Sequence, residues 1–146
     1  MSSFMRSLGE CWRCANLYRA AKFESLDIGC YQYTYILTVC RNPGIAQEAI
    51  SAQIYIHKSN VARQLAALEE KGFIERKTDE SDKRNLRVYP TQKAYDVLPE
   101  IERVLSEWDE MLLENFSEEE RAQLESLSAR LSARAKEIVR GLGEKQ

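Results

Sequence analysis

The chain has 146 residues, which is the usual length of one domain and enough to bury a real hydrophobic core. Its residues are 44% hydrophobic and 30% charged, a composition typical of globular proteins that excludes a disordered chain. No stretch approaches the roughly 18 apolar residues of a membrane span, and residues 1–9 contain no apolar run of a secretory signal. We therefore expect a cytoplasmic protein with no membrane partner and with reduced cysteines.

The net charge of −2 is unevenly distributed along the chain. Residues 1–40 carry a net charge of +1, and residues 41–93 carry +3 from ten basic and seven acidic side chains. Residues 94–146 carry −6. A DNA-binding surface needs positive charge where it faces phosphates and not over the whole chain, so the middle third is the candidate for such a surface.

Two helices are predicted in the first part of the chain. Residues 8–22 form a helix with an inner side at helical spacing, made by Leu8, Trp12, Ala15 and the stem of Arg19. Residues 29–41 form a more apolar helix with Tyr33, Ile36, Leu37 and Cys40 on one side. Pro43 and Gly44 end it, because proline disfavours helix in the residue before it and glycine permits a turn.

A helix-turn-helix follows. Residues 45–53 are predicted as a short helix with Ala46, Ala49 and Ile50 inside, and residues 55–57 as the turn, with His57 as the helix cap. Residues 58–71 form the second helix, with Val61, Leu65 and Leu68 facing inward at positions i, i+4 and i+7. Gly72 is the expected stop of this helix.

The remaining pattern predicts a two-stranded wing and two long helices. Residues 73–78 and 85–89 alternate apolar and polar side chains, as half-buried strands do, around a polar tip at residues 79–84. Thr91 is the expected cap of a helix with an apolar stripe from Leu98 to Leu112. Residues 117–120 (SEEE) form a capping box before the last helix, in which leucines recur from Leu124 to Leu142.

Polar side chains of the second helix are typical of contact with the major groove. Ser59, Asn60, Arg63 and Gln64 lie opposite the apolar side, close to the positive end of the helix dipole. Asparagine and glutamine match the edge of adenine, and arginine matches guanine or phosphate. The alternative is an ordinary solvated helix face, and the adjacent strands with a basic tip favour DNA binding.

With these features, the chain resembles the MarR family of winged helix-turn-helix regulators. The resemblance is carried by Gln47-Glu48-Ala49-Ile50, by Lys58 to Arg63, by Leu68 to Arg76, and by Asp79, Asp82-Lys83-Arg84, Val88 and Pro90 to Ala94. It covers about residues 8–140. It implies a mainly α fold with a β wing, in which residues 28–93 form the winged helix-turn-helix and residues 1–27 and 94–146 form dimerisation helices.

The resemblance also implies a function. A homodimer would bind a pseudo-palindromic double-stranded operator, with Arg84 in the minor groove and Asp82 holding the tip of the wing. We predict a repressor that a small-molecule effector releases from DNA. The predicted DNA-binding residues are Lys58, Ser59, Asn60, Arg63, Gln64, Lys83, Arg84 and Arg87.

Other chemistry is possible at the cysteines and aromatics. Cys11 and Cys14 form a CxxC pair inside a helix, without the preceding strand of a thioredoxin-like site, and Cys30 and Cys40 lie on the next helix. We expect small buried thiols, with thiol-based redox sensing as the alternative function. Trp12, Tyr31, Tyr35 and Trp108 either line an effector pocket or belong to the core.

Two other classes of protein are alternatives to a DNA-binding regulator. A thiol oxidoreductase would use Cys11 and Cys14, and a protein-binding winged helix would not need Arg63, Lys83, Arg84 and Arg87 on one side. No zinc ligand set, nucleotide loop or catalytic motif occurs in the sequence. We therefore predict a protein that is not an enzyme and that needs neither a metal nor a cofactor.

Overall fold

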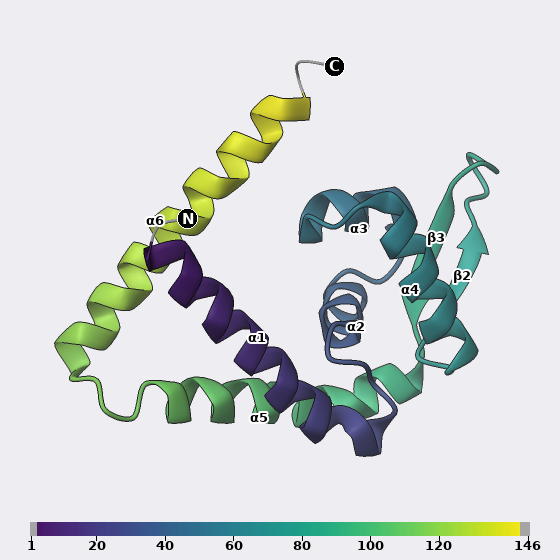
Figure 1. Cartoon of the computed structure of the whole chain (residues 1–146). Coiled ribbons are helices and arrows are strands. Elements are labelled where there is room, and N and C mark those ends of the chain that lie inside the picture. Colours follow the sequence, from purple (N-terminus) through teal and green to yellow (C-terminus); the bar gives the residue numbers. More distant parts are fainter. Residues whose placement is uncertain (1–2, 144–146) are drawn as a thin grey trace. The chain divides into compact units, whose positions relative to one another are not determined.

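The computed structural model describes residues 3–143 of the chain. It contains helices α1 (Ser3–Phe23), α2 (Gln32–Arg41), α3 (Gln47–Ile54), α4 (Lys58–Glu70), α5 (Gln92–Leu112) and α6 (Glu118–Gly143). The strands are β1 (Ile45–Ala46), β2 (Ile74–Thr78) and β3 (Leu86–Pro90), and a single 3-10 turn, η1, spans Glu24–Leu26 (Figure 1). The mainly helical fold with a β wing that the sequence predicted is confirmed.

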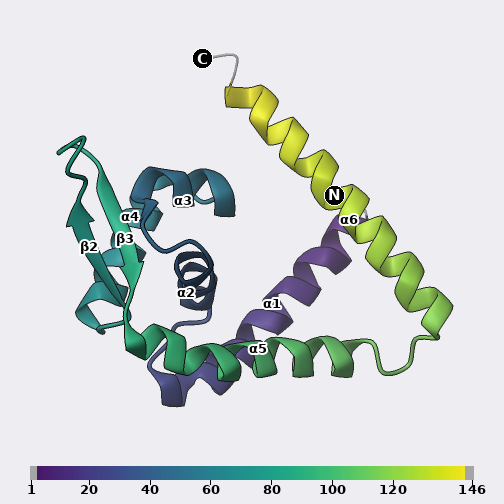
Figure 2. The same cartoon turned by 180° about the vertical axis from the view of Figure 1, so that it is seen from behind.

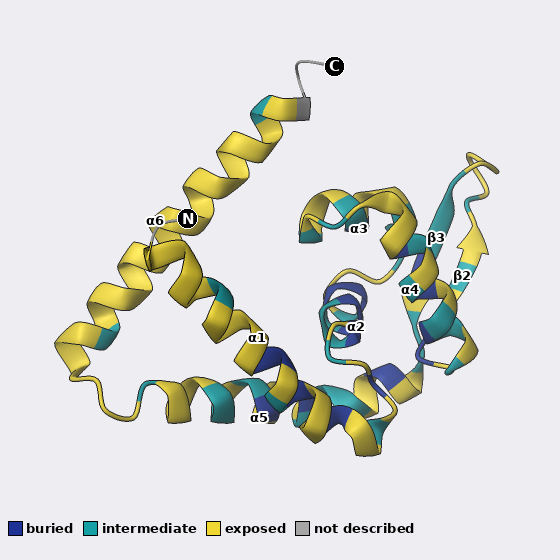
Figure 3. Cartoon of the chain, in the orientation of Figure 1, coloured by how far each residue is buried: buried dark blue, intermediate teal, exposed yellow. Residues whose placement is uncertain are grey.

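The chain divides after Trp108 into two compact units. In the first unit, buried residues gather around α2 and on the inner sides of α4 and β3, while α3 has one buried residue, Ile50 (Figure 3). The largest fully buried side chains include Tyr35, Ile36, Leu65, Leu68 and Phe73. The inward spacing of Val61, Leu65 and Leu68 predicted from the sequence is confirmed, since each is at most 1% exposed.

The sheet has three antiparallel strands in the order β1-β3-β2. Its longer pair, β2 and β3, forms the wing (Figure 2). The two predicted wing strands are present, and Val88 of β3 lies opposite both Ile45 and Arg76. The short strand β1 was predicted as the start of a helix. It forms because Gly44, with φ of +82°, turns the chain and donates its N–H to the Val88 carbonyl at 2.9 Å.

Both ends of α4 are stabilised as the sequence predicted. His57 caps the helix, its Nδ1 accepting the Ser59 N–H at 3.3 Å and lying 2.8 Å from the Ser59 hydroxyl. Gly72 follows the helix with φ of +79°, and Phe73 donates its N–H to the Leu68 carbonyl at 2.9 Å. The prediction for Thr91 is wrong in detail, because its hydroxyl donates to the Gly72 and Phe73 carbonyls and accepts no N–H of α5 among the described residues.

Several predicted helix faces differ from the structure. Helix α1 begins at Ser3, five residues earlier than predicted, and α2 begins at Gln32 instead of residue 29. In α1, Leu8 and Trp12 are exposed, and the buried residues are Ala15, Asn16, Arg19 and Phe23. In α3 only Ile50 is buried, and Ala49 is exposed. In α1 and α3 the apolar residues are spread around the helix and not gathered on one side, so the sequence periodicity defines the buried side poorly.

The second unit holds α6 and its capping box. Ser117 donates its N–H to Glu120 Oε2 at 2.9 Å, and its hydroxyl accepts the Glu120 N–H at 3.2 Å, which confirms the predicted box. The recurring apolar side chains of α6 are exposed, between 42% and 65%: Leu124, Leu127, Leu131, Ile138 and Leu142. Over residues 3–143, no helix combines the length and the apolar character needed to cross a membrane.

Candidate nucleic-acid interface

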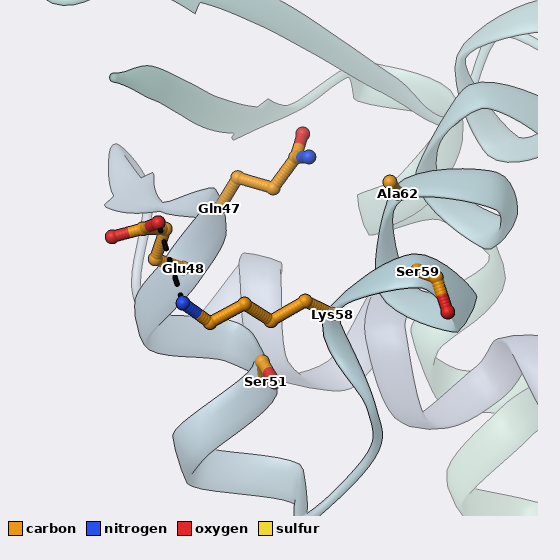
Figure 4. Close-up of a pocket in the computed structure, with 6 residues that line it drawn as sticks. All are labelled: Gln47, Glu48, Ser51, Lys58, Ser59 and Ala62. Atoms are coloured by element: carbon orange, nitrogen blue, oxygen red, sulfur yellow. Dashed lines mark ion pairs between the residues drawn. The ribbon is translucent and has the colours of Figure 1, made fainter. Parts of the chain in front are cut away.

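The helix pair α3–α4 presents a polar surface with a shallow depression between the two helices (Figure 4). Lys58 reaches across it, and its Nζ lies 3.6 Å from Glu48 Oε1. Both side chains are more than 70% exposed, so the pair is screened by water and contributes little to stability. The depression is lined by Gln47, Glu48, Ser51, Lys58, Ser59 and Ala62.

The predicted contact residues of α4 do not all face solvent. Ser59, Asn60 and Arg63 are exposed, and Arg63 Nη2 donates to Asn60 Oδ1 at 2.6 Å. Gln64 is half-buried, and its Oε1 accepts a hydrogen bond from Gln32 Nε2 of α2 at 3.1 Å. Both amides are therefore already engaged on their oxygen atoms before any DNA is present.

The tip of the wing is built around Asp82. Its carboxylate accepts the Arg84 N–H at 3.1 Å and the Asn85 Nδ2 at 3.0 Å, and its carbonyl accepts the Asn85 N–H at 2.9 Å. These bonds close the turn and leave Lys83 and Arg84 fully on the outside. The tip thus holds two exposed cations on a turn whose backbone is fixed by its own side chains.

Arg87 is placed differently from Arg84. Its Nε donates to Asp79 Oδ2 at 2.8 Å, and its Nη1 lies 3.3 Å from the Gly44 carbonyl. This guanidinium ties Asp79, where the tip of the wing begins, to the turn before β1. The predicted DNA contact of Arg87 would have to use the guanidinium N–H groups that do not bind Asp79 or Gly44.

An ion pair that the sequence analysis did not anticipate joins α4 to the wing. Arg76 donates to Glu69 Oε2 from Nε at 3.0 Å and from Nη2 at 2.8 Å, and its backbone N–H donates to Glu69 Oε1 at 2.9 Å. These bonds from Arg76 lower the pKa of Glu69 below its usual value. The pair holds β2 in a fixed position against the helix that carries Asn60 and Arg63.

The pKa of Asp79 offers a direct test of the wing geometry. The Ser81 hydroxyl and N–H, followed by Arg87, lower this pKa from 3.8 to about 2. A carboxyl with a depressed folded pKa stabilises the fold above its unfolded pKa and loses that contribution as pH falls through the folded value. We therefore expect the Asp79 contacts to persist at pH 4 and to be lost near pH 2.

Carboxyl-carbon NMR titration checks this expectation. In Ser81→Ala the midpoint for Asp79 should rise towards 3.8, because the largest cause of the shift is removed. An ordinary midpoint in the wild-type protein would contradict the wing structure.

The four aromatic residues proposed for an effector pocket differ in burial. Tyr35 is 1% exposed and belongs to the core, and Trp108 packs against Tyr18 with ring centroids 5.2 Å apart. Trp12 and Tyr31 are each about half exposed. Only these last two offer a surface to a ligand.

A buried arginine, predicted to have only a packing role, lies beside them. Arg19 is 9% exposed, its guanidinium is 5.3 Å from the Trp12 ring and 5.2 Å from the Tyr33 ring, and its Nη1 donates to Asn16 Oδ1 at 3.2 Å. Asn16 in turn donates to the Tyr31 hydroxyl at 3.2 Å. Within residues 3–143, Arg19 Nε is buried without a hydrogen bond. A buried cation with an unsatisfied donor is costly, so this cluster is a candidate anion site.

The cysteines are all free thiols, and they differ in exposure. Cys11 and Cys14 are exposed, so the expectation of buried thiols is wrong for this pair. Cys30 and Cys40 are half-buried, and burial raises the pKa of Cys40 to about 11, which makes it a poor nucleophile. Within residues 3–143, no three His, Cys, Asp or Glu side chains are close enough together to bind a metal ion.

Comparison with known proteins agrees with this geometry. The sequence model of the MarR family matches residues 31–86. The chain is 32% identical over 140 residues to the uncharacterised HTH-type transcriptional regulator YybA of Bacillus subtilis, covering 96% of this chain and 91% of that protein.

Solved structures are similar over nearly the whole chain. The transcriptional regulator SlyA superposes with a TM-score of 0.90 at 33% identity, covering 97% of this chain and 99% of that one. A MarR family regulator from Listeria monocytogenes, solved with a 26mer DNA, has the same fold, with a TM-score of 0.87 at 24% identity and coverage of 99% and 96%. The exposed polar face of α4, which we call the recognition helix, and the wing agree with these likenesses. The chain belongs to the MarR family of transcriptional regulators.

Proposed function

We propose that the protein is a homodimeric repressor that binds a pseudo-palindromic operator in double-stranded DNA, and not an enzyme. The observation that carries this proposal is the pairing, in one compact unit, of an exposed polar helix face at Asn60 and Arg63 with a basic tip held by Asp82. A helix of this kind fits the major groove, and an exposed arginine on a wing fits the narrow minor groove beside it.

The roles of the residues divide between sequence choice and affinity. Asn60, Arg63 and Gln64 would contact base edges, and Lys58 and Ser59 at the start of α4 would contact phosphate. Lys83 and Arg84 would bind the minor groove and its phosphates, with Asp82 as the support of the tip. Arg87 would act mainly by holding Asp79 at the start of the tip, because Asp79 and Gly44 already engage its guanidinium.

Relatives support DNA as the partner. The Listeria regulator was solved with a 26mer DNA, and a MarR variant from E. coli was solved with operator DNA. Both lie below 25% identity, so they support a shared fold and leave the operator of this chain open to experiment. Because its partner is DNA, we place the protein in the cytoplasm.

We propose residues 1–27 and 94–146 as the dimerisation helices and residues 28–93 as the DNA-binding part. The support is the row of exposed apolar side chains on α6, which a single chain leaves in contact with water. A twofold dimer would place two recognition helices one helical turn of DNA apart, roughly 34 Å.

Sequencing the DNA fragments that the purified protein retains would test the proposed function. We expect two inverted half-sites with centres about 10 base pairs apart. Retention of fragments without any shared sequence would contradict a sequence-specific regulator.

We propose that an anionic aromatic effector releases the DNA by binding at the cluster of Arg19, Trp12 and Tyr31. The buried guanidinium supports the anionic class, and the half-exposed rings support the aromatic one. The second candidate is release by oxidation, which the exposure of Cys11 and Cys14 favours. Either event would shift the dimer away from the spacing that fits the operator.

One titration distinguishes the two modes of release. The protein–DNA complex is treated with small aromatic acids in one arm and with hydrogen peroxide in the other. We expect release by an acid that Arg19→Met abolishes and that Cys11→Ser and Cys14→Ser leave unchanged. Release by peroxide alone, lost in either cysteine variant, would replace the effector by the redox mechanism.

A further inference from the structure

Gln32 of α2 occupies the centre of a hydrogen-bond network beneath the recognition helix. It is 7% exposed, and its Oε1 accepts the Gly29 N–H at 2.9 Å and Lys71 Nζ at 3.2 Å. Its Nε2 donates to Gln64 Oε1 at 3.1 Å. Lys71 also lies 2.8 Å from the Asp27 carbonyl and 3.2 Å from its Oδ1, so the cation is held in place.

The chemistry of these partners fixes which end of each amide points where. A backbone N–H and a lysine ammonium can only donate, so the atom of Gln32 that faces Gly29 and Lys71 must be its oxygen. The amino group of Gln32 then faces Gln64, and the atom of Gln64 that meets it must be an oxygen as well. Gln64 is thereby oriented by two obligatory donors that lie outside the recognition helix.

The outward end of Gln64 is therefore its amino group. Gln64 is half-buried, lies one turn beyond the exposed Asn60, and its Nε2 has no hydrogen-bond partner within residues 3–143. Asn60 shows the same polarity, since its Oδ1 accepts from the Arg63 guanidinium at 2.6 Å. This face of α4 offers donors to the groove from both of its amides.

We propose that Gln64 contacts one base through Nε2 alone, so that the base edge opposite it must be an acceptor, and that Gln32 sets this choice as a positioning residue without touching DNA. Guanine, with O6 and N7, thymine, with O4, and adenine, with N7, each present such an acceptor. Cytosine presents the N4 amino group, which would face another donor. A contact with both N7 and the N6 amino group of adenine needs Gln64 Oε1 to face the groove, but this oxygen accepts the hydrogen bond from Gln32. The inference rests on the proposed sequence-specific binding of DNA.

The decisive change is Gln32→Glu, which has nearly the same shape as the wild-type side chain. One carboxylate oxygen would accept from Gly29 and Lys71, with the ammonium compensating the new charge. The other oxygen cannot donate, so Gln64 would turn its amino group inward and present Oε1 to the groove. Cytosine, which offers only an amino group, should then become favoured, and guanine and thymine, which present only acceptors, should become disfavoured. Adenine, with both N7 and the N6 amino group, fits either orientation of Gln64.

The experiment measures binding of the full-length protein to a retained operator and to duplexes carrying each base at every half-site position. Gln64→Ala identifies the position that Gln64 contacts, because the wild-type preference there should disappear. At that position we expect a preference of about tenfold for an acceptor edge in the wild-type protein. Gln32→Glu should reverse it by a similar factor, and Gln32→Glu with Gln64→Ala should behave as Gln64→Ala alone.

A second variant guards against a folding defect. If thermal unfolding shows that Gln32→Glu is not folded, Gln64→Glu gives the same test, since one of its oxygens accepts from Gln32 and the other faces the groove. An unchanged preference in the folded variants, or no position affected by Gln64→Ala, overturns the inference while leaving sequence-specific binding intact. A wild-type protein with no sequence preference overturns the proposed function, and this inference with it.

Discussion

Replacing Leu131 with Glu should convert the protein to a monomer and reduce operator binding by about a hundredfold or more. Leu131 lies in the middle of the apolar row on α6 and is 43% exposed in the single chain. If this row is the dimer interface, the substitution places an unpaired carboxylate in an apolar contact, which costs about 3–5 kcal/mol for each such buried charge. Two half-sites would then be bound independently, without the gain of a linked pair.

Light scattering and operator binding at micromolar protein concentration measure the two effects. Ala133→Glu is the matched control, because it adds the same charge to an exposed position about 200° around the helix. The control should remain a dimer. A wild-type protein that is monomeric at this concentration would refute α6 as a dimerisation helix.

Replacing Phe73 with Ala should destabilise the DNA-binding unit by about 3–5 kcal/mol, the usual cost of removing a buried phenyl ring. Phe73 is fully buried at the point where α4 ends and β2 begins. Its N–H donates to Leu68, its carbonyl accepts from Thr91, and the ring lies 4.3 Å from Lys93 Nζ. The cavity would therefore loosen the recognition helix, the wing and the start of α5 together.

Urea unfolding followed by circular dichroism measures this loss. Gln53→Ala, at an exposed position of α3, serves as the control and should change stability by less than about 0.5 kcal/mol. A loss below about 1 kcal/mol in Phe73→Ala would mean that this residue does not join the three elements as the structure has it.

Features encoded in a few adjacent residues were predictable from the sequence. His57 and Gly72, which bound α4, and the Ser117–Glu120 box before α6 follow rules that depend only on local backbone geometry. The inward face of α4 was also predictable, because its three large apolar residues, Val61, Leu65 and Leu68, lie on one side of the helix.

Features that depend on distant partners were not predictable in this way. The strand β1 exists only because Val88, more than forty residues later, pairs with Ile45. The burial of Arg19, the link from Arg76 to Glu69, and the inward turn of Gln64 to Gln32 likewise depend on tertiary packing. A helical pattern assigned Gln64 to the outer side of α4, but it contained no information about which end of the amide would face outward.

The candidate site shows the same division. The exposure of Asn60, Arg63, Lys83 and Arg84 agrees with their predicted placement, although their contacts with DNA remain a prediction. Arg87 differs from them because its position within β3 brings Asp79 and Gly44 within reach. An arginine in a strand has neighbours on both adjoining strands, whereas one at a turn is free to contact a ligand.

The proposed DNA-binding surface is formed by the wing and α4 together. It is tested most directly by binding curves for Arg84→Ala and Arg63→Ala on a cognate and a scrambled duplex at two salt concentrations. Arg84→Ala should weaken binding to both duplexes and reduce the salt slope by about one unit, because one phosphate-neutralising charge is lost. Arg63→Ala should cost about 1–3 kcal/mol on the cognate duplex and much less on the scrambled one. If both variants bind both duplexes as the wild-type protein does, the winged helix is not the DNA-binding surface.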